Sequence, residues 1–118
     1  MVCTKELINK TTDLLKTMGI PTNVKGFEYI RYGIMLKCLY PNRYTRLTKE
    51  LYPEVAKHYE TTYTRVESAC RHAIESGYER GNQKLYYEIF GNTLGKQPTN
   101  SIFFATICDY LSKETSNH

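Results

Sequence analysis

Apolar residues recur at helical spacing along nearly the whole chain, and this periodicity restricts the fold more than any other feature of the sequence. Before Gly19, the residues Leu7, Leu14, Leu15 and Met18 fall on one side of a helix. No segment alternates apolar and polar residues for long enough to predict a strand. We therefore expect an all-α fold, a compact bundle of about six helices.

Glycine, proline and capping residues delimit the expected helices. Gly19 predicts a left-handed cap for the first helix, and Pro41 ends the second. The expected helices are Thr4–Met18, 27–40, a short helix near Leu47–Leu51, 53–59, 62–76, 83–90 and a last one that begins at Thr99 or Asn100. Gly33 inside the second helix costs about 1 kcal/mol relative to Ala, which suits a position where another backbone packs closely. We expect a loop over 92–98 and fraying over 115–118.

The length of 118 residues fits one domain that spans the chain. No run approaches the roughly 18 apolar residues of a membrane span, and the N-terminus lacks the apolar core of a signal peptide. We therefore expect a cytoplasmic protein without a membrane segment. Cys3, Cys38, Cys70 and Cys108 form no C-x-x-C pair, so we expect reduced thiols used for packing, and no bound metal.

The segment 53–77 has the layout of a helix-turn-helix. It begins with a short helix that has Pro53 in its first turn, continues with a tight turn, and ends with an amphipathic helix that stops at Gly77. Either Thr62 or the capping box Thr64-x-x-Glu67 can begin the second helix. The second helix is therefore the candidate recognition helix.

One face of this second helix is polar and carries groups that can contact DNA. Arginine forks can bind guanine edges, a carboxylate can accept from cytosine, and hydroxyls can contact phosphates. The candidate DNA-binding residues are Thr62, Tyr63, Thr64, Arg65, Glu67, Ser68, Arg71 and His72. The alternative is a solvated face on which Glu67 and Arg71 form an ordinary i, i+4 ion pair.

Basic residues outside this helix are candidate phosphate contacts. These are Lys25, Arg43, Arg46 and Lys49, in a chain with a net charge of +4, although surface solvation explains them equally well. We find no nucleophile with a base, paired carboxylates or phosphate-binding loop, so we expect no enzymatic activity and no cofactor.

The longer string 51–75, LYPEVAKHYETTYTRVESACRHAIE, resembles the C-terminal DNA-binding domain family of the sporulation master response regulator, stage 0 sporulation protein A. The resemblance extends upstream to GIP at 19–21, KGF at 25–27 and YIR at 29–31. Downstream it includes RGN at 80–82, FG at 90–91 and KQPTNS at 96–101.

This resemblance implies a six-helix, sequence-specific reader of duplex DNA in spore-forming bacteria. Its targets would be boxes of the type TGTCGAA, often tandem sites that two domains occupy as a dimer. Within it, Arg65, Glu67, Arg71 and His72 match positions that touch DNA. It also implies a contact with RNA polymerase sigma factor through 76–94, where the candidate residues are Tyr78, Gln83, Lys84, Tyr86 and Tyr87.

Three positions depart from the family pattern. Ser68 replaces an arginine of the family, so one long cationic donor is missing. Glu60 stands where the family has asparagine, and Tyr63 where it has a small residue. These departures predict altered reading of the box and an altered turn.

The family joins this domain to an N-terminal receiver, for which the chain has no room, so we expect either an excised domain or a free-standing relative. A protein-interaction module that binds sigma factor or a full-length relative without reading DNA is the alternative to a DNA reader. The sequence does not separate activation from repression.

Overall fold

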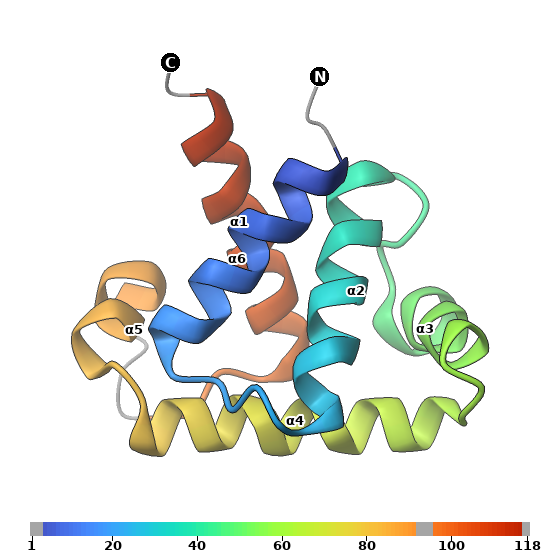
Figure 1. Cartoon of the computed structure of the whole chain (residues 1–118). Helices are drawn as coiled ribbons and strands as arrows, with labels where there is room; N and C mark the ends of the chain where they lie inside the picture. Colours follow the sequence, from blue (N-terminus) through green and yellow to red (C-terminus); the bar gives the residue numbers. More distant parts are fainter. Residues whose placement is uncertain (1–3, 92–95, 117–118) are drawn as a thin grey trace.

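The computed structural model describes residues 4–91 and 96–116, and in these ranges the secondary structure is helical with no strand (Figure 1). The elements are α1 (Thr4–Met18), α2 (Lys25–Leu39), the π-helical turn η1 (Leu47–Leu51), α3 (Tyr52–His58), α4 (Tyr63–Arg80), α5 (Gln83–Phe90) and α6 (Asn100–Ser116). This confirms the all-α fold class.

Helix α4 lies across the ends of the other long helices (Figure 1). Helix α2 packs against α1, α4 and α6, whereas α3 and α5 contact opposite ends of α4. The centre of the core is formed by fully buried side chains of α2, η1 and α6, among them Ile30, Ile34, Leu51, Phe103 and Ile107. The packing leaves the outer side of α4 facing away from the bundle.

Most of the helix bounds agree with the sequence prediction. Helices α1 and α5 match it, α2 begins two residues earlier, and Gly19 has the left-handed φ of 92° expected of a cap. Helix α6 continues through Ser116, so Thr115 and Ser116 are helical where we predicted fraying. Within the predicted loop 92–98, residues 92–95 lie outside the described part of the chain, as do Cys3 and residues 117–118.

The predicted end of the recognition helix at Gly77 is wrong, because α4 continues to Arg80. Gly77 is buried inside the helix, and a Cβ there would lie 2.6 Å from both Ile20 Cδ1 and Tyr86 Oη. The glycine thus permits close packing and does not stop the helix, which ends at Arg80 with Gly81 as its C-cap.

Two further glycines set distances between helices. A Cβ on Gly33 would lie 2.8 Å from the Phe104 ring, so the neighbour that explains this helical glycine is a side chain and not the backbone that we expected. At Gly26, in the first turn of α2, a Cβ would collide with the Ala69 carbonyl oxygen and lie 2.8 Å from Ala73 Cβ. Gly26 therefore lets α2 approach the backbone of α4 directly.

In the described residues no three His, Cys, Asp or Glu side chains cluster in a way that suits a metal ion. None of the described helices combines the length and apolar character needed to cross a membrane. Cys70 is fully buried, as expected of a packing thiol, and Cys38 and Cys108 are half-buried free thiols.

The close approach at Gly26 predicts that Gly26→Ala destabilises the protein. The added methyl must push α2 away from α4, which should reduce the free energy of unfolding by about 1–3 kcal/mol despite the better helix propensity of alanine. Urea denaturation measures the change, with Lys25→Ala at the exposed neighbouring position as the control. A Gly26→Ala variant as stable as the wild type would contradict this account of the α2–α4 contact.

Candidate functional site

Helices α3 and α4 with the turn 59–62 form the predicted helix-turn-helix. Pro53 lies in the first turn of α3, and Val55 and Ala56 are buried against the bundle. Thr62 is the N-cap of α4, and its Oγ1 accepts a hydrogen bond from the Arg65 backbone N–H at 3.3 Å. Of the two predicted starts of the helix, the structure therefore selects Thr62.

Glu60 gives the turn its shape. Its φ of 53° is the only positive φ among the described non-glycine residues. The backbone reverses there, and the Thr61 N–H donates to the Ala56 carbonyl at 2.9 Å. A glutamate adopts this left-handed conformation at a cost in free energy, whereas asparagine adopts it more readily. The family resemblance implies asparagine at this position, so Glu60 departs from the family at the strained residue of the turn.

Helix α4 is amphipathic, as the sequence predicts. Val66, Cys70, Ala73 and Ile74 are buried against the bundle. Of the candidate DNA-binding residues, Thr62, Tyr63, Thr64, Arg65, Arg71 and His72 are exposed, and Glu67 and Ser68 are half-buried. The structure thus brings all eight candidates to the start and outer side of one helix.

Glu67 and Arg71 form the i, i+4 ion pair that the sequence suggested. Their side chains are 38% and 49% exposed, so the pair contributes only a few tenths of a kcal/mol and separates at little cost. The arginine fork therefore remains available for another acceptor.

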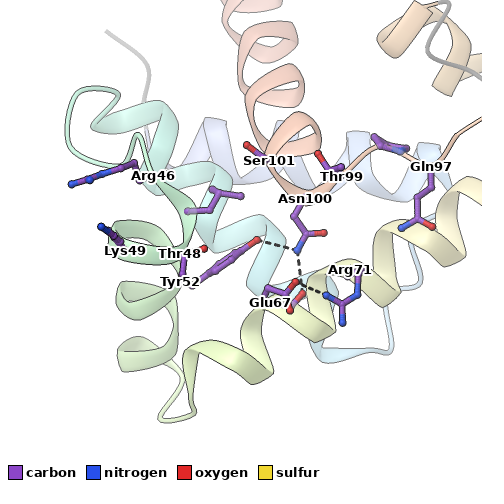
Figure 2. A pocket seen from close by; sticks show the side chains of 12 residues that line it. Arg46, Thr48, Lys49, Tyr52, Glu67, Arg71, Gln97, Thr99, Asn100 and Ser101 are labelled. Atoms are coloured by element: carbon purple, nitrogen blue, oxygen red, sulfur yellow. Dashed lines mark hydrogen bonds and ion pairs between the residues drawn. The ribbon is translucent and has the colours of Figure 1, made fainter.

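Asn100, at the start of α6, holds the backbone of α4 near this pair. Its Nδ2 donates to the Glu67 carbonyl oxygen at 3.1 Å and to Tyr52 Oη at 3.0 Å (Figure 2). Burial raises the pKa of Tyr52 to about 12, further above physiological pH than the ordinary value of a tyrosine. One amide thus connects α3, α4 and α6.

A groove of about 810 Å³ lies between α4, η1 and the start of α6. We call it the η1 groove. Arg46 and Lys49 line it from the η1 side, Arg71 lines it from α4, and Asn100 lies between Tyr52 and Glu67 (Figure 2). Its remaining lining residues are Leu47, Thr48, Gln97, Pro98, Thr99 and Ser101. Cations and hydroxyls therefore line one side of α4.

A smaller hollow of about 290 Å³ lies on the other side of α4, and we call it the α2 groove. Lys25 lines it beside Gly26 and Val24, and His72 and Ser76 line it from α4. The structure thus places three of the four candidate phosphate contacts beside α4. The fourth, Arg43, lines neither groove, and its guanidinium lies 5.3 Å from the centre of the Tyr44 ring.

Sequence reasoning missed the contribution of α6 to this site. Gln97, Thr99, Asn100 and Ser101 line the η1 groove, whereas the sequence predicts Thr99 and Asn100 as helix caps and 96–101 contributes only to the family resemblance. Thr99 is indeed a cap, since its Oγ1 accepts a hydrogen bond from the Ile102 backbone N–H at 3.2 Å. The run of four polar residues around Pro98 was the available signal, but periodicity cannot show which helix it faces.

The candidate sigma-contacting residues differ in exposure. Gln83, Lys84 and Tyr87 are exposed on α5, and Tyr78 is half-buried. Tyr86 is 1% exposed, stacks on Phe90 and donates a hydrogen bond to the Ile74 carbonyl at 3.5 Å. The prediction that Tyr86 is a surface residue is therefore wrong. At 3.6 residues per turn, its side chain lies on the face of α5 that packs against the core.

The description "Sporulation initiation factor Spo0A C terminal" belongs to a family model that matches residues 11–111 of the chain. The match includes the helix-turn-helix, both grooves and α5. It confirms the resemblance inferred from the sequence.

The positive φ of Glu60 predicts that Glu60→Asn stabilises the protein by about 1 kcal/mol, because asparagine adopts the left-handed conformation more readily. Thermal unfolding of the two proteins measures the gain. Glu60→Gln is the matched control, since it removes the same charge without favouring the left-handed conformation. Equal stability of all three proteins would show that the turn is not strained.

Proposed function

The chain belongs to the family of Spo0A C-terminal domains, and from this premise we propose that it is a transcription regulator that binds duplex DNA sequence-specifically through α4. The observation that carries the proposal is the exposed polar face of α4, with a cation-lined groove on each side. A recognition helix that enters the major groove needs both features.

The residues of α4 have distinct roles in this proposal. Arg65 and Arg71 present forked donors that suit the O6 and N7 acceptors of guanine, and Glu67 can accept from a cytosine amino group. In the free protein Arg71 pairs with Glu67, and on DNA it exchanges this partly exposed partner for a base edge. Since the ion pair contributes little free energy, the exchange costs little.

The two grooves suit the two DNA backbones. The major groove is only about 12 Å wide, so phosphates run along both sides of a helix that occupies it. Arg46 and Lys49 would contact one strand from the η1 groove, and Lys25 would contact the other from the α2 groove. These contacts would provide affinity and orientation, and the α4 side chains would provide specificity.

The exposed side of α5 is the part of the proposal that concerns protein partners. Gln83, Lys84 and Tyr87 are exposed on the helix that follows the C-terminal end of α4. This surface would bind RNA polymerase sigma factor while α4 is bound to DNA. Binding of two copies to tandem sites also belongs to the proposal.

We predict that Arg71→Ala lowers DNA affinity and leaves the fold intact. Loss of one base contact should weaken binding about 5-fold to 100-fold, whereas the free energy of unfolding should change by less than about 0.5 kcal/mol. Selection of bound duplexes from a random pool, followed by titration of the enriched sequence, measures the effect.

Lys113→Ala is the matched control for Arg71→Ala. It removes the same charge and a comparable i, i+4 ion pair, with Asp109 at 3.1 Å, near the end of α6 farthest from α4 (Figure 1). This control should bind like the wild type. If the two variants bound equally, Arg71 would have no specific role, and a wild-type pool that stayed random would favour the protein-interaction alternative.

We also predict that Ser68→Arg changes sequence preference towards boxes of the type TGTCGAA. Ser68 lies between Arg65 and Arg71 along α4, and arginine there restores the donor that the family carries. Ser101→Arg is the control, because it adds the same charge at the η1 groove and should strengthen binding to all sequences alike. The selected motif reports the outcome, and an unchanged motif for Ser68→Arg would contradict the assignment.

A further inference from the structure

Two thiols from distant parts of the chain meet beside the core. Cys38, near the end of α2, and Cys108, on α6, are 70 residues apart in sequence, and their Sγ atoms lie 3.1 Å apart. Cys108 also points to the preceding turn of α2, with its Sγ 3.7 Å from the Ile34 carbonyl oxygen. Both residues are half-buried, so a small oxidant can reach them.

We propose that Cys38 and Cys108 are an oxidation site at which a peroxide forms a reversible disulfide between α2 and α6. The sulfur atoms are already in contact, and a bond of about 2.05 Å requires them to approach by only about 1 Å. Cys70, the other cysteine of the described residues, is a fully buried free thiol.

The surroundings of the pair assign different roles to the two sulfurs. A hydrogen bond shared with Cys108 lowers the pKa of Cys38, and the neighbouring Lys37 lowers it further, against the effect of burial. The same hydrogen bond and burial raise the pKa of Cys108. The lowered pKa favours Cys38 as the attacking thiolate, with Cys108 as the resolving thiol, since the thiolate is the nucleophilic form.

The reaction balances with hydrogen peroxide as the oxidant. The Cys38 thiolate attacks one peroxide oxygen, the O–O bond breaks, and the released hydroxide takes up a proton to form water. Cys38 is now a sulfenic acid. The Cys108 sulfur then attacks the Cys38 sulfur, the S–S bond forms, the S–O bond breaks, and the leaving oxygen departs as a second water with the thiol proton. Two thiols lose two electrons, and one peroxide gains them.

The cross-link would join the two helices that support α4 from behind, because α2 and α6 both pack against α4. It would close a loop of about 70 residues and so restrict the unfolded chain strongly. Neither cysteine lies on α4, so the inference is independent of the proposed DNA reading.

The experiment exposes the reduced full chain to hydrogen peroxide and measures its intact mass and a peptide map without reductant. We expect a monomer that is lighter by two hydrogen atoms, a bond that maps to Cys38 and Cys108, and a melting temperature higher by roughly 10 °C. Dithiothreitol should reverse all three changes. Cys70→Ser should react like the wild type, and Cys38→Ser should lose the mass change.

Three results would overturn the proposal. One is an unchanged mass of the folded chain after peroxide treatment, when the same treatment forms disulfides in the urea-unfolded chain. Another is a map that places the bond at Cys3 or Cys70, or between two chains. The third is accumulation of sulfinic acid on Cys38 in place of the disulfide. Each is read from the wild-type protein, so none depends on whether a serine variant folds.

Discussion

The direct approach of α2 to α4 at Gly26 is the contact on which the rest of the structure depends. Because Gly26 has no side chain and faces Ala69 and Ala73, the backbone of α2 lies against the inner side of α4. This contact determines which side chains of α4 are buried and which are exposed. A larger residue at the crossing would move α4 as a unit, and the cation at Lys25 would move relative to His72.

A second constraint acts from the opposite side of α4. Asn100 holds the Glu67 carbonyl and the Tyr52 hydroxyl with one amide group. Helix α4 is therefore held by backbone packing on the α2 side and by hydrogen bonds on the α6 side. Neither constraint uses a side chain that we assign to base reading, so the reading residues can change without loss of the supporting structure.

The sequence predicts local features of this molecule well and distant contacts poorly. The stripe of apolar residues and the capping residues are local signals, and they predict α1, α5 and the helix-turn-helix close to their actual bounds. Gly77 was misinterpreted because glycine has two uses, ending a helix and permitting close packing, and only the contact with Ile20 and Tyr86 separates them. The η1 groove could not be predicted because it joins residues near 46, 70 and 100, which are distant in the sequence and share no periodic pattern.

In the proposed function the grooves bind phosphates and α4 reads bases. This difference matters at Ser68, where the family resemblance implies an arginine. Under the proposed function, phosphate contacts from Lys25, Arg46 and Lys49 would act on any sequence, so a chain without one base-reading donor would retain most of its affinity. Under the proposed function, specificity would then depend more on Arg65 and Arg71. Because the Glu67–Arg71 ion pair is partly exposed and weak, Arg71 can exchange it for a base edge at little cost. Loss of a donor in the proposed site would reduce discrimination between sequences more than it reduces binding, and the proposed DNA reader would then occupy related boxes with relaxed preference.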